Sequence, residues 1–206
     1  MTATSLRKGE LTRQAILQRA ARMASRVGLE GLTIGALADE LELSKSGLFA
    51  HFKSKEELQL QILEFGIARF VDTVVKPALA TPRGEKRVKA LFEHWLEWPN
   101  TSGFAGCLFV AFATELDDQP GRVRERLVQS QKEWLGVIAQ AARVAVAHGD
   151  FQRDTDAEQF AHELYGIMLA GHHAQRLLRA RGAAERTRRA FERLLEDARV
   201  ERRGKS

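Results

Sequence analysis

A chain of 206 residues with 44% hydrophobic side chains can bury a sizeable core, and its four prolines and few β-branched runs favour an all-helical protein. The single cysteine, Cys107, excludes an internal disulfide, and the most apolar run, 104–113, is about half of the roughly 20 residues that a membrane span needs, so we expect a soluble cytoplasmic protein. The net charge of +5 is compatible with a nucleic-acid partner, but residues 179–206 alone hold ten Lys/Arg against five Asp/Glu, so charge by itself does not identify one.

The first predicted helix runs from about Thr12 to Val27, after ten residues that we expect to form a flexible arm. Apolar residues recur along one face of this helix, at Ile16, Ala20, Met23, Ala24 and Val27. Gly28 follows directly, and glycine is the common residue just past the end of a helix. The helix is expected to pack against the two short helices that follow it.

Residues 33–52 predict two short helices joined by a tight turn. Thr33 is a good N-cap for the first helix, whose apolar residues recur at i, i+3, i+4 and i+7. These positions are Ile34, Leu37, Ala38 and Leu41. Ser44 is placed to cap the second helix, 45–51, in which Leu48 faces inward. Helices this short are marginal alone, and a small donor-rich helix supported by its neighbours is the shape that enters a DNA major groove.

Three stretches resemble the DNA-binding domain of tetracycline-repressor (TetR) family transcription regulators. They are TRQAIL at 12–17, GLEGLTIGALA at 28–38 and LSKSGLFAHFKSKEEL at 43–58. The resemblance implies a DNA-binding domain at 10–56, with its helix-turn-helix motif at 33–52, and a C-terminal helical regulatory and dimerisation domain at 57–206, about nine helices in all. The residues that it implies for DNA contact are Thr33, Ser44, Lys45, Ser46, Gly47, Leu48, Phe49, His51 and Lys55.

The chain departs from the usual pattern of the family at three positions. Glu42 stands where the family usually has glycine, in the turn, and a non-glycine residue with positive φ costs roughly 1 kcal/mol. Phe49 replaces the usual tyrosine and so lacks a hydroxyl that would bond a phosphate. Ala50 stands where histidine or asparagine is common. None of these changes removes the fold of the motif.

A capping box, Ser54 paired with Glu57, predicts the start of a fourth helix. The charge of Lys55 at this helix start opposes the helix dipole. A DNA phosphate, bound by this lysine and by free main-chain N–H groups, would explain the charge. The alternative is an exposed lysine, tolerated at a cost of roughly a few tenths of a kcal/mol. The helix would continue to about Lys76 as the only covalent path between the domains.

Five further helices are predicted in the C-terminal part of the chain. The first two cover about 85–98 and 104–116, and the second of these is too apolar to lie at the surface. The third runs from about Pro120 to His148. The fourth begins with a capping box at Thr155, and the fifth covers about 183–200.

The resembled family encloses a small-molecule pocket among its C-terminal helices, and a set of aromatic and polarisable side chains could line one here. The set is Trp95, Trp98, Phe104, Cys107, Phe109, Phe112, Trp134, Tyr165, Met168 and His172. Such a pocket would take a small apolar or aromatic effector, and we expect no cofactor and no metal. The alternative is that these residues are simply core, as aromatic residues and methionine at helical spacing usually are.

The last two helices are expected to form the interface of a homodimer. Gly166, Ala170 and Ala174 recur at every fourth position and would let a second helix approach closely. The final helix adds a narrow apolar seam between charges, at Phe191, Leu194, Leu195 and Ala198. Two-fold symmetry is expected independently, because one short recognition helix buries too little surface to specify an operator. The alternative is that both strips pack within the chain.

The residues present do not favour an enzyme. Cys107 and His94 could be imagined as a nucleophile and a base, but nothing at short range organises them. His162 lacks a second histidine four residues later, so it is not part of a zinc protease motif. His172 and His173 are adjacent, about 100° apart on a helix, and cannot easily bind one metal.

The sequence therefore predicts a homodimeric, all-α transcription regulator, a repressor that a small ligand releases from a palindromic operator. We expect no membrane partner. Two alternatives remain open: a ligand-independent architectural DNA-binding protein, and a helical interaction protein whose helix-turn-helix is vestigial. Salt-dependent binding to one palindrome separates the first interpretation from both.

Overall fold

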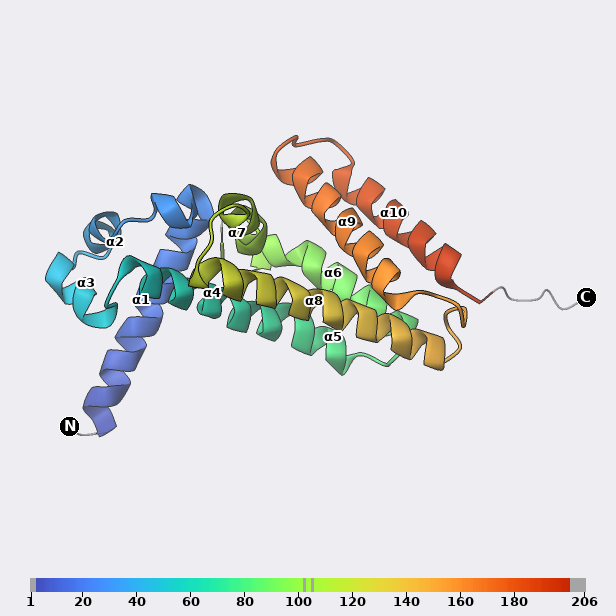
Figure 1. Cartoon of the computed structure of the whole chain (residues 1–206), viewed down its shortest axis with the longest axis horizontal. Helices are drawn as coiled ribbons and strands as arrows, with labels where there is room; N and C mark the ends of the chain where they lie inside the picture. Colours follow the sequence, from blue (N-terminus) through green and yellow to red (C-terminus); the bar gives the residue numbers. More distant parts are fainter. Residues whose placement is uncertain (1–2, 102, 105, 201–206) are drawn as a thin grey trace, which may run out of the picture. The chain divides into compact units, whose positions relative to one another are not determined.

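The computed structural model describes residues 3–101, 103–104 and 106–200, and within them it contains ten α-helices and one π-helical segment (Figure 1). The prediction of an all-helical protein is confirmed, since the only β-type pairing in the described residues is a bridge between Phe151 and Arg199. Within this part of the chain, no helix is both long and apolar enough to cross a membrane.

The helices form two compact units. The first unit is made by the chain up to Phe70 together with Pro99–Ser130, and the second by Val71–Trp98 together with the chain from Gln131 onward. The chain therefore passes between the units three times. These units differ from the predicted domains at 10–56 and 57–206, and the helices around Trp98 and Ser130 also run from one unit into the other. The division at residue 56, with one helix as the only covalent path between the two domains, stays a prediction.

The first unit contains α1 (Ala3–Gly31), α2 (Ile34–Glu40), α3 (Lys45–His51), α4 (Lys55–Phe70) and α7 (Leu108–Leu116). Helix α1 starts at Ala3, well before the predicted start, where the sequence suggested a flexible arm. It contacts α2, α4 and α7, and α2 contacts α3. Fully buried side chains from these helices form the core of the unit, among them Ile16, Leu29, Leu37, Leu48, Phe52 and Ile62.

The predicted fourth helix is divided in the structure. Helix α4 gives way to the π-helical segment η1 (Val71–Val75) and then to α5 (Lys76–Ala80), where Pro77 occupies the first turn. Proline lacks an N–H and so removes one hydrogen bond of a helix, and the π-helical segment directly precedes it. Helix α6 (Glu85–Thr101) continues through Pro99, beyond the predicted end at Trp98.

The second unit also contains most of α8 (Arg122–Ala147), with α9 (Ala157–Arg176) and α10 (Ala183–Ala198). Helices α9 and α10 form a hairpin and pack along each other (Figure 1). Phe191 of α10 stacks on Phe92 of α6 with 3.9 Å between ring centroids. Arg199, just after α10, holds Glu85 with two hydrogen bonds of 2.7 and 2.9 Å, which fixes the end of the hairpin to the start of α6.

Candidate functional site

Two short side-chain caps fix the starts of α2 and α3. The Thr33 hydroxyl accepts the N–H of Ala36 at 3.0 Å, and the Ser44 hydroxyl accepts the N–H of Gly47, also at 3.0 Å. The hydroxyls of Ser44 and Ser46 lie 3.1 Å apart. These caps satisfy N–H groups that a helix start leaves without a partner. Both predicted caps are therefore present, and they set where each helix begins.

The turn between α2 and α3 is a Schellman motif with glutamate at its left-handed position. Glu42 has φ of 53°, the N–H of Leu43 donates to the Ala38 oxygen at 2.9 Å, and the N–H of Glu42 donates to the Asp39 oxygen at 3.2 Å. This position normally takes glycine, because a Cβ is strained there. The positive φ that the family resemblance implied at Glu42 is present, and both hydrogen bonds of the turn form.

The outer face of α3 presents Lys45, Ser46 and Ala50 to solvent, with Gly47 and His51 half-buried. The Lys45 side chain lies against α2, since a Cβ built on Gly35 would be 3.4 Å from its Cε. Leu48 is 0% exposed and belongs to the core, so the expectation that it contacts DNA directly is corrected. The Phe49 side chain lies outside the described part of the structure.

Lys55 has a partner within the protein. Its ammonium group lies 3.0 Å from Oε2 of Glu30 and donates to the Glu30 main-chain oxygen at 3.1 Å. Hydrogen bonds from Gln59 and from Lys55 lower the pKa of Glu30 below the usual range. The contact with Glu30 therefore explains a cation at this helix start without a DNA phosphate. The sequence argument for a phosphate did not consider this contact.

Glu115 of α7 is a residue that the sequence did not single out. Its carboxylate accepts the N–H of Leu29 at 2.7 Å and that of Glu30 at 2.6 Å, where α1 kinks at Gly28. The residues are more than 80 positions apart, and no local pattern marks the pairing. Only the packing of α7 on α1 brings them together.

The ten residues predicted to line a ligand pocket divide between the two units. Phe104, Cys107, Phe109 and Phe112 belong to the first unit, and the other six to the second. All are buried except Tyr165 and His172, which are half-buried. Their burial agrees with a core role. One pocket lined by all ten stays a prediction.

Two polar groups in the second unit distinguish it from a plain apolar core. The Tyr165 hydroxyl lies 2.6 Å from Oε1 of Gln131. The Nε2 atom of His172 is buried and has no hydrogen-bond partner among the described residues. Burial lowers the pKa of His172, as do the charges of Arg176 and His173, so this imidazole favours its neutral form. A buried polar atom without a partner is uncommon in proteins and calls for an explanation.

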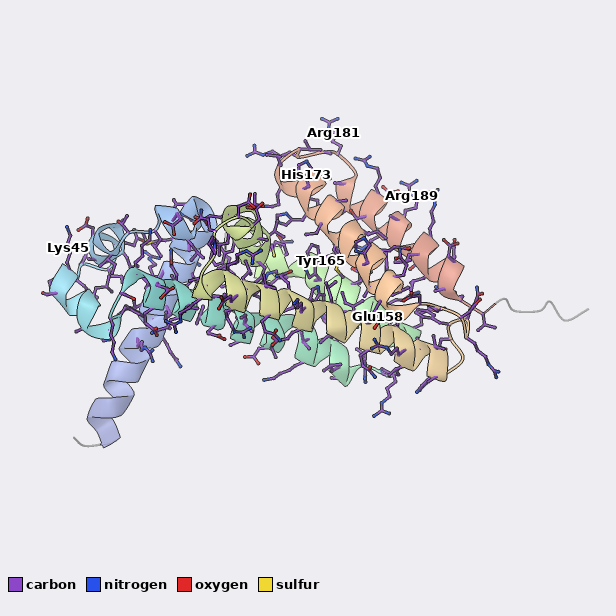
Figure 2. All side chains as sticks on the ribbon, viewed as in Figure 1. Lys45, Glu158, Tyr165, His173, Arg181 and Arg189 are labelled. Atoms are coloured by element: carbon purple, nitrogen blue, oxygen red, sulfur yellow. The ribbon has the colours of Figure 1, made fainter. Side chains whose placement is uncertain are left out.

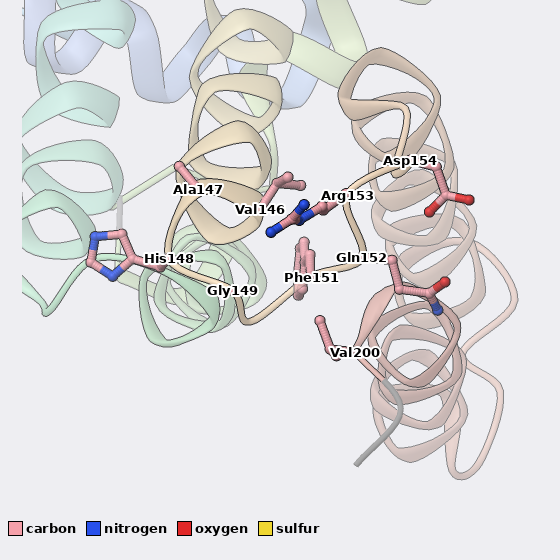
Figure 3. Close-up of a pocket in the computed structure, with 9 residues that line it drawn as sticks. All are labelled: Val146, Ala147, His148, Gly149, Phe151, Gln152, Arg153, Asp154 and Val200. Atoms are coloured by element: carbon pink, nitrogen blue, oxygen red, sulfur yellow. The ribbon is translucent and has the colours of Figure 1, made fainter. Parts of the chain in front are cut away.

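Three grooves lie on the second unit, and the ten predicted side chains line none of these three. One, of about 960 Å³, lies at the connection between α8 and α9, where Arg153 extends toward Val146 over the ring of Phe151 (Figure 3). A second, of about 630 Å³, adjoins it at Gly149 and Val200. The third, of about 450 Å³, is mostly apolar and is lined by residues of α5, α6 and α8.

The predicted dimer residues have two different environments. On α9, Gly166 and Ala170 are exposed and Ala174 is half-buried, and a Cβ on Gly166 would meet nothing within 4 Å. This strip is therefore free to receive another helix. The α10 seam is not, because its four residues are buried within the chain itself, which corrects the expectation that they face a partner. They are Phe191, Leu194, Leu195 and Ala198.

Large apolar side chains are exposed at the C-terminal end of α9. Leu177 and Leu178, at the end of α9, are 71% and 61% exposed. Arg181 and Arg189 extend into solvent from the α9–α10 connection and from α10 (Figure 2). Large exposed leucines next to a small-residue strip are typical of a protein–protein contact surface.

Two family models match the chain. The model for bacterial regulatory proteins of the tetR family matches residues 16–62, and the model for tetracyclin repressor-like C-terminal domains matches residues 84–191. The chain is also similar to the HTH-type transcriptional repressor KstR2 of Mycobacterium tuberculosis. The two are 28% identical over 158 residues, which cover 74% of the chain and 72% of KstR2.

Solved structures share the fold. A TetR transcriptional regulator from Chloroflexus aurantiacus has a TM-score of 0.83 at 23% identity, over 94% of the chain and 99% of that protein. A regulator from Saccharomonospora viridis, solved in complex with choline, has a TM-score of 0.80 at 25% identity, over 94% of the chain and 100% of that protein. The similarity in each case extends over both units.

Proposed function

The chain belongs to the tetracycline-repressor family of bacterial transcription regulators, and we propose that it represses by binding a palindromic operator as a homodimer and leaves the operator when a small ligand binds. The observation that carries the DNA-binding half is the α2–α3 motif. Its two helices have side-chain caps and a closed Schellman turn, and the polar outer face of α3 is exposed. A helix presented in this way can enter a major groove.

The exposure of each side chain, and whether it caps a helix, determine the role in DNA binding that we propose for it. Lys45 and Ser46 are exposed on α3 and are proposed to reach base edges or phosphates. Thr33 and Ser44 use their hydroxyl oxygens as caps, so we assign them to positioning, with hydroxyl protons available to phosphates. Lys55 is proposed to bind a DNA phosphate as well as Glu30.

A dimer is proposed because one α3 is too short to specify an operator. Two copies related by a two-fold axis would present their recognition helices to half-sites about 34–36 Å apart. The exposed α9 strip with Gly166 and Ala170 supports this assembly, since small residues allow close helix approach. The exposed Leu177 and Leu178 at its end add apolar surface that a partner would cover.

The ligand half of the proposal is supported by the second unit. Trp95, Trp98 and Trp134 are buried there, together with Met168 and the half-buried Tyr165. His172 offers a neutral imidazole whose Nε2 would find its missing hydrogen-bond partner in a ligand. We therefore propose an apolar or aromatic ligand with one polar group.

The DNA-binding half is tested by capturing genomic fragments with the purified full chain and measuring affinity for the enriched sequence at several salt concentrations. We expect one palindrome to be enriched, with an affinity that falls steeply with salt. Enrichment without a shared sequence would favour an architectural DNA-binding protein. No enrichment at all would favour a helical interaction protein.

The ligand half is tested with two probes of different chemistry, an apolar aromatic compound such as naphthol and the quaternary ammonium choline. We expect naphthol to quench tryptophan fluorescence, raise the melting temperature and weaken operator binding together, because binding to one conformation shifts all three equilibria. Choline acting in place of naphthol would instead indicate recognition of a cation by aromatic rings. Quenching that leaves operator affinity unchanged would contradict ligand-controlled release.

A further inference from the structure

The end of α1 is held by a single carboxylate from a distant part of the sequence. At Gly28 the main chain leaves helical geometry, with φ of 78° and ψ of 171°. The next two N–H groups, of Leu29 and Glu30, converge on Glu115 of α7 at 2.7 and 2.6 Å. A carboxylate that accepts two main-chain N–H groups makes short, charge-assisted hydrogen bonds, which are stronger than neutral ones.

Gly28 is the residue that makes room for this carboxylate. A Cβ at this position would lie 2.8 Å from Oε2 and 2.9 Å from Oε1 of Glu115, closer than real Cβ contacts allow. The positive φ also favours glycine. Backbone conformation and the position of Glu115 therefore both require glycine here. The kink at Gly28 and the contact of the Glu115 carboxylate depend on each other.

Leu29 and Glu30 are also held by side chains of α4. The side-chain amide of Gln59, itself buried, donates to the Leu29 oxygen at 3.3 Å and to Glu30 at 3.0 Å. Lys55 completes the contacts with Glu30. Leu29 and Glu30 thus make hydrogen bonds to both α7 and α4, and the N-cap of α2, Thr33, follows three positions after Glu30. Any shift of α7 relative to α4 acts on this segment and hence on the start of α2.

We propose that Glu115 is a positioning residue for operator binding. Its contact with Leu29 and Glu30 sets the position of α2 and α3. Through this contact, the position of α7 determines the fraction of molecules that can bind DNA. This inference rests on the proposed function. Helix α7 is joined by the chain to α6 and α8, both of which run into the second unit. A change within the second unit therefore has a covalent route to α7, and Glu115 extends that route to the DNA-binding motif.

The test compares Glu115→Gln with Glu64→Gln in the full chain. An amide can accept one N–H but points its own NH2 group at the other, so Glu115→Gln breaks the paired contact. Glu64 is the matched control, since it also ties two helices of the first unit through its carboxylate, binding Arg126 at 2.5 and 3.2 Å, without touching residues 28–30. The probe is the DNA fragment that the wild-type chain enriches.

We expect Glu115→Gln to weaken binding at least about tenfold, within the usual range of coupling between sites, and Glu64→Gln less than about twofold. The slope of affinity against salt should be the same as in the wild type, because the phosphate contacts are intact and only the competent fraction falls. Amide exchange at Leu29 and Glu30 should accelerate in Glu115→Gln alone, and saturating DNA should slow it again, as linkage requires.

Faster exchange at Leu29 and Glu30 with affinity within twofold of the wild type would overturn the proposal, and so would unchanged exchange. If Glu115→Gln does not fold, Glu115→Asp keeps the charge with a shorter reach, and its affinity should fall by less, again at an unchanged salt slope. A wild-type chain that enriches no DNA contradicts the proposed function instead. The exchange measurement needs no DNA, so it still reports on the Glu115 contact separately.

Discussion

The ammonium group of Lys55 lies 3.0 Å from Oε2 of Glu30, which joins the start of α4 to the end of α1. The two side chains are 41% and 52% exposed, so water screens the pair and its contribution to stability is at most about 1 kcal/mol. Because this ion pair is weak, Lys55 can exchange Glu30 for a DNA phosphate in a complex with DNA. The contact explains why a cation is tolerated at this helix start.

Replacing Lys55 by alanine should weaken binding to all sequences evenly and reduce the salt slope by about one unit, because one phosphate contact is lost. Glu30→Gln keeps the lysine and removes its charged partner, so the slope should remain as in the wild type. Fluorescence anisotropy at several salt concentrations measures both. An unchanged slope in Lys55→Ala would mean that the lysine serves Glu30 only.

Lys45 should behave differently from Lys55, because it lies on the exposed face of α3. If it reaches a base edge, Lys45→Ala should relax the preference at one position of the operator by about 1–3 kcal/mol. Binding to a library of operators with single base changes measures this. An even loss across the whole library would instead place Lys45 on a phosphate.

Gly166→Leu should produce a folded monomer that no longer binds the operator. A side chain at Gly166 meets nothing within the chain, so folding should be unaffected, while a leucine would block close approach of a partner helix. Gly136→Leu is the matched control, since it is also an exposed helical glycine with nothing within 4 Å and lies on α8. Sedimentation gives the assembly state of each. A Gly166→Leu chain that sediments as a dimer would remove α9 from the interface.

Glu42→Gly should raise the free energy of unfolding by up to about 1 kcal/mol. Glycine relieves the left-handed strain at φ of 53°, and the greater freedom of glycine in the unfolded chain offsets part of that gain. Glu42→Ala removes the same charge and keeps the Cβ, so it should give no such gain. Urea denaturation distinguishes the two, and an equal gain in both variants would assign the effect to charge.

His172 should make the protein less stable as the pH falls below about 6.5. Burial lowers the pKa of His172 in the folded state, so the unfolded chain binds its proton at a pH where the folded chain does not. As the pH is lowered, the unfolded state therefore takes up this proton before the folded state does, and the free energy of unfolding decreases. His172→Phe should remove this dependence between pH 7 and 5. His173→Phe, on the exposed face of the same helix, should leave most of it in place, because burial is the largest cause of the lowered pKa of His172 and the charge of His173 comes after it. Thermal melts across this range provide the measurement.

Local chemistry was enough to predict the helix-turn-helix. Thr33 and Ser44 cap helices because their hydroxyls reach N–H groups three residues away. The expectation at Glu42 came instead from the resemblance, since the family usually has glycine there. The periodic apolar residues likewise predicted individual helices, as at Ile34, Leu37 and Leu41. These features depend on neighbours within a few positions, so the sequence alone determines them.

The tertiary structure decided which faces of the later helices are covered. The apolar stripe of α10 is the same in sequence whether it meets a partner or its own chain, and only packing assigns Phe191 to the stack with Phe92. The contact of Glu115 with Leu29 and Glu30 joins positions more than 80 residues apart. Glu115 and Gly28 can both be read in the sequence. Their contact depends on how α7 packs against α1, which no local sequence pattern encodes.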